Sequence, residues 1–249
     1  MSPPIKKVLF YLILAALWEG MFQLLPGKVP SPINVLRSLV EGITERGYLW
    51  GVGVSLRRIV LGFGVSIVVG IFLGILLAWS RTLEETMGSA IVSLQALPSI
   101  CWLPLSLLWF GISEEAILFV VVIGSLLSIT MATMTGIKRV PPILTSAART
   151  MGARGLGLHL QVTLPAALPS VVEGMKQGWS FAWRSLMAGE LLFVTQGIGH
   201  YLGMSRDLGD MNQVVAVMLL IVAIGLIVDL LVFATLEQKI RERWGLQKG

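Results

Sequence analysis

The sequence predicts an all-α integral membrane protein, a single domain over residues 1–249 with about six transmembrane helices. Hydrophobic residues make up 55% of the 249 residues and charged residues only 13%, whereas an average soluble domain has roughly 25% charged residues. Several runs without any charge also reach the ~20 residues that a helix needs to cross the hydrocarbon core of a bilayer. A soluble globular protein is therefore a poor interpretation.

Uncharged runs predict three of the spans directly. They are Ile59–Trp79, Thr86–Ser113 and Ala116–Ile137. Two more apolar segments are interrupted or ended by one acidic residue. Val8–Leu25 contains Glu19, and Met211–Val228 is followed by Asp229. Each of these two is still long enough to be a span.

The segment after Pro169 is the remaining candidate, although it carries four charged residues. These are Glu173, Lys176, Arg184 and Glu190. An ionised side chain near the centre of a bilayer costs at least about 3 kcal/mol when it faces lipid. We therefore expect this fifth span in chain order to be buried among other helices.

Gly70 and Gly74 lie four residues apart within the span Ile59–Trp79. Small residues at this spacing allow two helix backbones to approach closely. We expect the partner helix to belong to the same chain rather than to a second copy.

Lysine and arginine are distributed unevenly over the segments between the spans. Eleven lie in segments on the N-terminal side of the membrane: Lys6, Lys7, Arg81, Lys138, Arg139, Arg149, Arg154, Lys239, Arg241, Arg243 and Lys248. Six lie in the opposite segments: Lys28, Arg37, Arg46, Arg57, Arg58 and Arg206. Because cytoplasmic loops carry the excess of basic residues, both termini are expected in the cytoplasm. The scatter of these residues over short loops also explains the net charge of +5 without nucleic-acid binding.

No catalytic residue and no metal site is predicted. The single cysteine, Cys101, excludes an internal disulfide and a cysteine-cluster metal site, and it is expected to fill space in a span. His159 and His200 are expected on opposite sides of the membrane, so they cannot share a metal. An integral membrane enzyme would need a nucleophile with its base, or a metal site, and the spans contain few residues for either.

The longest cytoplasmic excursion, about residues 138–168, lies between the fourth and fifth spans. A short helix is predicted over Leu144–Met151, with Thr145 or Ser146 as its N-terminal cap. Gly152 can then end that helix in a left-handed turn, and Pro165 and Pro169 mark the start of the next span. Small residues on this helix let another surface approach closely, so the segment is expected to be held by a partner.

This loop resembles the signature of a known family, the membrane-spanning permease subunits of bacterial ATP-binding-cassette importers. That signature is Glu-Ala-Ala, three residues, Gly, nine residues, a branched apolar residue, one residue and Leu-Pro. Ala147, Ala148, Gly152, Val162, Leu164 and Pro165 stand at this spacing. Ser146 stands where the family usually has Glu. The resemblance implies a role in ATPase coupling for these residues together with Arg149.

Three further stretches carry the resemblance over nearly the whole chain after the first span. They are SLRRIVLGFGVSIVVGIFLGILLAW from Ser55, LPSICWLPLSLLWFGISEEA from Leu97, and WSFAWRSLMAGELL from Trp179. These stretches are similar to the branch that imports nitrate, sulfonates, taurine or bicarbonate. A small, anionic solute is thus the expected substrate, and permeases for vitamin precursors in the same branch are the alternative.

The resemblance implies the type I importer fold and a set of partners in a bacterial inner membrane. Two permease subunits pair, and we expect the second to be another copy, with a paralogue as the alternative. Two cytoplasmic ATP-binding subunits hold ATP and Mg, and an extracytoplasmic protein delivers the substrate. The residues agree on one point independently, because the chain has no G-x-x-x-x-G-K-[ST] phosphate loop. A secondary transporter driven by an ion gradient would usually show internal repeats, and none is found.

Candidates for the translocation path come from the spans themselves. Arg184 is expected to line the path, with packing against another helix as the alternative, whereas for Glu190 packing is preferred over the path. Ser180 shares the face of Arg184. Pro98 and Pro104 remove backbone donors from the third span and are expected to kink it, which membrane helices tolerate beside cavities.

Overall fold

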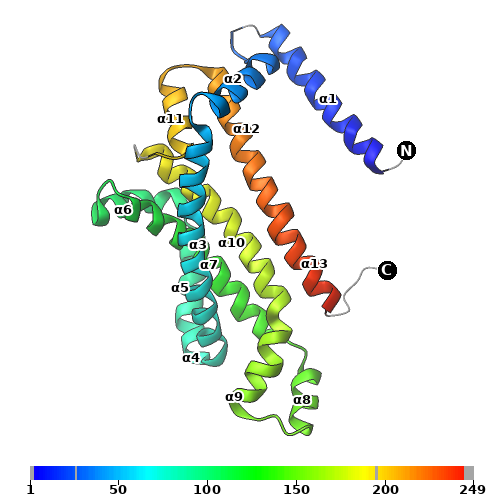
Figure 1. Ribbon diagram of the computed structural model, residues 1–249. Helices are drawn as coiled ribbons and strands as arrows, with labels where there is room; N and C mark the ends of the chain where they lie inside the picture. The colour runs from blue at the N-terminus through cyan, green and yellow to red at the C-terminus, as the bar shows by residue number, and fades with distance from the viewer. Residues whose placement is uncertain (1–2, 26, 194–195, 244–249) are drawn as a thin grey trace.

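The computed structural model describes residues 3–25, 27–193 and 196–243, and all regular structure in these ranges is helical. The predicted all-α class is confirmed. Figure 1 shows an elongated bundle with α2 (Pro32–Thr44) and α11 (Ile198–Asp207) at one end, hereafter the α11 end. The opposite end, hereafter the α8 end, carries α4 (Arg81–Leu83), α8 (Pro142–Thr150) and α9 (Gly155–Leu158).

Three long helices form the centre of the molecule: α3 (Tyr48–Trp79), α7 (Glu114–Lys138) and α10 (Leu164–Leu192). Many of their buried residues are small, namely glycine, alanine, serine and threonine, and these pack with branched apolar side chains and two stacked tryptophans, Trp179 and Trp183. A Cβ added at Gly74 would lie 2.5 Å from the Cβ of Thr133 in α7, and one at Gly70 would lie 3.0 Å from Ile129. The expected packing of this glycine pair within the chain is confirmed.

Among the described residues, four helices are long and apolar enough to span a membrane. They cover Tyr48–Trp79, Glu114–Lys138, Gly155–Leu192 and Met211–Ile240. The last contains α12 (Met211–Val228), a π-helical turn (Asp229–Phe233) and the start of α13 (Ala234–Arg243). Asp229 therefore ends the uncharged run but not the helix. Within α1 (Pro3–Leu24), the apolar part Val8–Leu24 is shorter than these spans.

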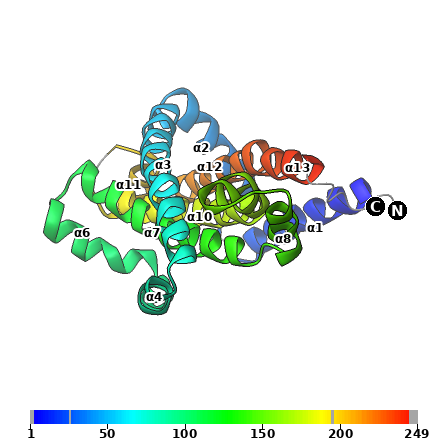
Figure 2. The ribbon, with the colours of Figure 1, turned by 90° about the horizontal axis from the view of Figure 1, so that it is seen from below.

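The predicted third span, Thr86–Ser113, is not one helix. The helical segments Arg81–Gln95 and Ser99–Phe110 meet at an angle of 102°. The first contains α4, a π-helical turn (Glu84–Gly88) and α5 (Ser89–Gln95), and the second a 3₁₀ turn (Ser99–Trp102) and α6 (Leu103–Phe110). Pro98 stands at the break because it has no amide hydrogen and disfavours helical geometry at the residue before it. Figure 2 shows this bent pair to one side of the central helices.

Pro104 lies in the first turn of α6, where a missing amide hydrogen costs nothing. The predicted kink at this residue is therefore wrong, and the whole bend lies at Pro98. The assignment of Arg57 and Arg58 to a connecting segment is also wrong, because α3 already begins at Tyr48. Lys248 lies outside the described residues.

Helix α1 diverges from the bundle in Figure 1. Its side chains from Val8 to Leu14 are exposed in the single chain.

At the α8 end, contacts between side chains hold the neighbouring segments together. Lys138 pairs with Glu84, and the rings of Trp79 and His159 lie 5.2 Å apart, so that the turn before α10 packs on the end of α3.

Candidate functional site

A polar stripe runs along one face of α10. Glu173, Gln177, Ser180 and Arg184 are all exposed in the single chain. Their spacing of four, three and four residues places them within about 60° of one another around the helix axis. The other face buries the core residues Trp179, Ala182 and Leu186. The fifth span is thus buried on one side only, and its charged side chains other than Glu190 lie on or beside the open side.

Arg184 lines a hollow of about 300 Å³, hereafter the Arg184 hollow. Its walls come from three elements: Phe181 and Arg184 of α10; Ile123, Gly124 and Leu127 of α7; and Leu94 to Ser99 with Trp102 of the bent pair. Pro98, at the break of the bent pair, is one of the lining residues. The structure therefore brings together Arg184 and Pro98, two residues that the sequence proposed separately.

The guanidinium of Arg184 has no acidic partner within residues 3–25, 27–193 and 196–243. Its Nε donates to the carbonyl oxygen of Ser180 at 3.0 Å, and its Cζ lies 4.8 Å from the centre of the Phe181 ring. Both contacts orient the side chain without neutralising it. The remaining N–H groups leave this planar cation able to bind a carboxylate, sulfonate or nitrate through two parallel hydrogen bonds.

A second hollow of about 320 Å³, hereafter the Gln177 hollow, continues the stripe toward the α8 end. Gln95 lines both hollows, so they adjoin. The polar lining of the second one comes from Gln95, Ser128, Thr135, Arg139, Ser170, Glu173 and Gln177. Sequence reasoning missed Gln95, Gln177 and Arg139, because single polar residues in apolar helices give no signal until their faces are known.

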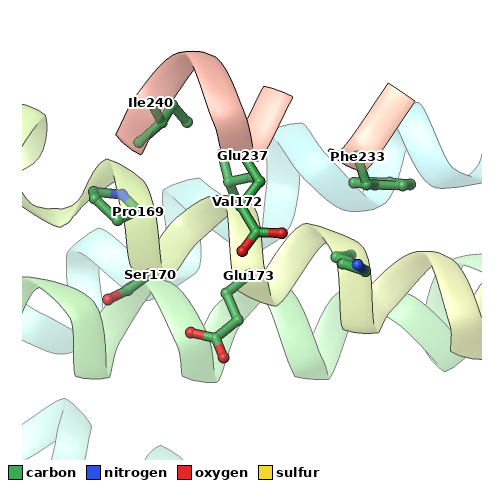
Figure 3. A pocket seen from close by; sticks show the side chains of 8 residues that line it. Pro169, Ser170, Val172, Glu173, Phe233, Glu237 and Ile240 are labelled. Carbon is green, nitrogen blue, oxygen red and sulfur yellow. The ribbon is translucent and has the colours of Figure 1, made fainter. Parts of the chain in front are cut away.

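Ser180 lies on the stripe between the two hollows but lines neither. Its hydroxyl donates to the carbonyl oxygen of Lys176 at 3.3 Å. The ammonium of Lys176 pairs with Asp229 at 3.3 Å and lies at a different hollow. That hollow, of about 500 Å³, lies between α10 and α13 and is shown in Figure 3 with Glu173 and Glu237 on its walls. Two carboxylates and a paired lysine make it unsuited to an anion.

Glu190 is placed away from both hollows of the stripe. It is fully buried and forms an ion pair with Arg58 at 2.9 Å, where α10 meets α3 near the α11 end. Sequence reasoning missed this pairing because Arg58 stands 132 residues earlier in the chain and was assigned to a loop. The two opposite charges lie in contact, so the carboxylate of Glu190 is paired within the chain.

The signature loop forms the helix expected of it, with a different start. Helix α8 begins after Pro141, so neither Thr145 nor Ser146 caps it, and Thr145 instead donates to the carbonyl oxygen of Pro142. None of its residues is buried, although Ile143 and Leu144 are apolar. Ala147 and Arg149 lie on this open helix.

Gly152 has the predicted left-handed backbone, with φ at 92°. The amide groups of Met151, Gly152 and Ala153 donate to carbonyls of the last turn of α8, including that of Ala148 at 2.9 Å. The later signature residues are placed in the membrane helix: Val162 is in the π-helical turn His159–Thr163, and Leu164 and Pro165 begin α10. One end of the signature is therefore an open helix, and the other end belongs to the helix that carries Arg184.

Comparison with known proteins agrees with this arrangement. Residues 66–242 match the family model described as "Binding-protein-dependent transport system inner membrane component". A putative ABC transporter permease protein of Methanocaldococcus jannaschii is 36% identical over 81% of this chain and 76% of its own length. The nitrate import permease protein NrtB of Leptolyngbya laminosa is 29% identical over 76% of this chain and 68% of its own.

A putative aliphatic sulfonates transport permease protein of Escherichia coli, SsuC, is 30% identical over 98% of this chain and 96% of its own length. Among solved structures, a permease chain of the inward-facing MetNI methionine ABC transporter superposes with a TM-score of 0.69. It is 19% identical and covers 79% of this chain and 99% of that chain, so it shows the fold alone. This chain belongs to the family of binding-protein-dependent transport system inner membrane components, the permease subunits of ATP-binding-cassette importers.

Proposed function

We propose that this permease carries a small oxyanion of the nitrate and sulfonate class into the cell, and that Arg184 binds the anion on its way. The observation that carries the proposal is the unneutralised guanidinium of Arg184 in a hollow between α10, α7 and the bent pair. A cation without a counterion attracts anions strongly where water is scarce. The nitrate and sulfonate importers named above support the same class of substrate.

The polar stripe is half of a path in this proposal, because it is exposed on one side of a single chain. A second copy of the chain closes it from the other side. Leu94 and Leu97, apolar residues of the bent pair that line the Arg184 hollow, are exposed and suit contact with that copy. Arg139 and Gln177 then line the part of the path nearer the α8 end.

The α8 end faces the cytoplasm in this proposal, and the membrane is the bacterial inner membrane. There α8 binds a separate ATPase subunit, which holds ATP and Mg, while the α11 end faces the external binding protein. The excess of basic residues in the segments that the sequence assigns to this side of the membrane supports this orientation. Both termini then lie in the cytoplasm.

Cysteine labelling checks the orientation. In a variant without Cys101, a cysteine at Thr150 is expected to be protected from a membrane-impermeant maleimide in intact cells, and one at Asn34 is expected to react. Both positions are exposed in the chain, so protection reports the side of the membrane. Permeabilised cells, in which both should react, are the control. Labelling of the Thr150 variant in intact cells would reverse the orientation.

Uptake into vesicles tests the function. The permease is reconstituted with its ATPase subunit and its binding protein, and uptake of nitrate, ethanesulfonate and thiamine is measured with and without ATP. We expect ATP-dependent uptake of one of the two anions and none of the cation. Uptake of thiamine alone would favour a vitamin-precursor permease, and uptake driven by an ion gradient without ATP would favour a secondary transporter.

A further inference from the structure

Glu190 lies directly against the N-terminus of α11. One carboxylate oxygen accepts from Nη1 of Arg58 at 2.9 Å, and the other accepts from the backbone N–H of Gly199 at 3.0 Å. The hydroxyl of Ser55 lies 2.8 and 2.7 Å from the two oxygens and accepts from the backbone N–H of Ile198 at 2.9 Å. The first amide groups of α11 are thus held by side chains of α10 and α3.

Two glycines make this contact possible. A Cβ added at Gly197 would lie 2.4 Å from the carboxyl carbon of Glu190, and a Cβ added at Gly199 would lie 2.6 Å from its Cβ. Real Cβ atoms do not approach other atoms so closely. The chain at the start of α11 can therefore contact Glu190 only if residues 197 and 199 have no side chain. The sequence Gly-Ile-Gly meets this requirement.

Arg58 joins the same cluster to the rest of the α11 end. Its side chain is 3% exposed. In addition to Glu190, it donates to the backbone carbonyl of Gln196 and to the carboxylate of Glu114 at the start of α7. A buried ion pair is strongly destabilising when only one partner is removed, because the other charge stays buried. Four segments, α3, α7, α10 and the chain leading into α11, are accordingly fixed to one another.

Glu190 connects α11 to the helix that also carries Arg184. Arg184 stands six residues earlier on the same helix, about 9 Å along its axis. Helix α11 is partly open at the end of the molecule, with Met204, Arg206 and Leu208 exposed. A displacement of α11 from outside can therefore be passed to α10 through Glu190, which holds the first turn of α11, in addition to the direct packing of Gly199 and Gly203 on α10.

We infer that Glu190 is a positioning residue that fastens α11 to α10, so that contact with the external binding protein at α11 moves the helix that carries Arg184. The partner and the direction of this signal rest on the proposed function, whereas the fastening itself does not. Glu190 touches no substrate in this mechanism and acts through α10.

Hydrogen exchange tests the fastening without any substrate. The permease–ATPase complex is placed in lipid nanodiscs, and exchange is measured for the wild type, Glu190→Gln and Ser55→Ala. We expect the amides of residues 196–201 to exchange at least tenfold faster in both variants, while those of residues 118–134 in α7 remain as protected as in the wild type. Asp207→Asn is the matched control, because it removes an exposed carboxylate from α11 itself, and it should leave exchange unchanged.

Wild-type protection of residues 196–201 in both Glu190→Gln and Ser55→Ala would overturn the inference. Equal loss of protection throughout α7 and α11 would also overturn it, because the cluster would then support the whole bundle rather than α11. The Ser55→Ala variant keeps the ion pair and removes only the hydroxyl between Glu190 and Ile198. It therefore stays informative if Glu190→Gln assembles poorly.

A second measurement tests the signal. ATP hydrolysis by the reconstituted complex is compared with and without the binding protein loaded with nitrate or, separately, ethanesulfonate. We expect the ratio of stimulated to unstimulated hydrolysis to fall at least fivefold in Glu190→Gln. It should stay at the wild-type value in Glu19→Gln, which makes the same substitution at an exposed carboxylate of α1, outside α11. An unchanged ratio in Glu190→Gln would refute the signalling role. If neither anion stimulates the wild type, the proposed substrate class is wrong, and hydrogen exchange still decides the fastening.

Discussion

Replacing Arg184 by glutamine is expected to reduce anion uptake by about 10- to 100-fold, the loss that corresponds to one charged hydrogen-bonding group worth about 1.5–3 kcal/mol. Glutamine keeps a donor and much of the length but removes the charge and the planar pair of N–H groups. Uptake of nitrate and ethanesulfonate into vesicles is the measurement. The amount of ATPase subunit that co-purifies with the permease shows whether the complex has assembled.

A charge-retaining variant separates attraction from geometry. Arg184→Lys is expected to keep partial uptake, because an ammonium still attracts an anion but cannot form two parallel hydrogen bonds to it. Arg81→Gln is the matched control, since it removes an exposed guanidinium that is paired with Glu85. If Arg184 only anchored packing, assembly and thermal stability of the complex would fall together with uptake. Normal anion uptake by a well-assembled Arg184→Gln complex would contradict its role in the path.

Replacing Gly152 by valine is expected to weaken binding of the ATPase subunit and to lower coupled ATP hydrolysis severalfold. A Cβ at Gly152 would meet nothing within 4 Å, so the substitution acts through the backbone alone. A left-handed residue with a branched side chain is strained by about 1–3 kcal/mol, which favours a different ending for α8. Co-purification of the ATPase subunit and hydrolysis stimulated by the loaded binding protein are measured together.

A charge reversal on the same helix tests the surface instead of the backbone. Arg149 is exposed on α8, and Arg149→Glu is expected to give the same defect by replacing attraction to an acidic partner surface with repulsion. Gly157→Ala is the control for the loop, because Gly157 is helical and an added Cβ also meets nothing within 4 Å. Wild-type stimulation in Gly152→Val and Arg149→Glu would show that this loop does not transmit the signal.

The long uncharged runs were predictable because crossing a bilayer requires a local property, enough consecutive apolar residues. Two of the three uncharged runs are single helices, and Gly152 has the left-handed turn that its place after α8 predicted. The run Thr86–Ser113 has the same composition but folds as a bent pair. Its apolar residues satisfy the length rule whether the chain is straight or broken, so only the geometry at Pro98 distinguishes the two.

The candidate path was predictable only in part. An arginine in an apolar span must face a cavity or a partner, which singled out Arg184 before its surroundings were known. Gln95 and Gln177 carry no charge, so they cost less in an apolar segment than an arginine does, and the local signal that marks them is weaker. Glu190 was singled out as costly to expose to lipid. Its partner Arg58 could not be identified from the sequence, because the two residues are far apart along the chain and meet only when α3 packs against α10.

The sequence by itself determined the class of the molecule, the helix that ends at Gly152 and the presence of charges that must avoid lipid, since each depends on neighbouring residues. The tertiary structure decided where those charges go. Packing of α10 against α3 and α7 through small residues directs Glu190 into a closed cluster with Arg58. The same packing leaves Arg184 on the open side of α10, beside the bend at Pro98. The two side chains stand six residues apart, and which one meets an opposite charge is set by the helix face that the neighbouring helices cover.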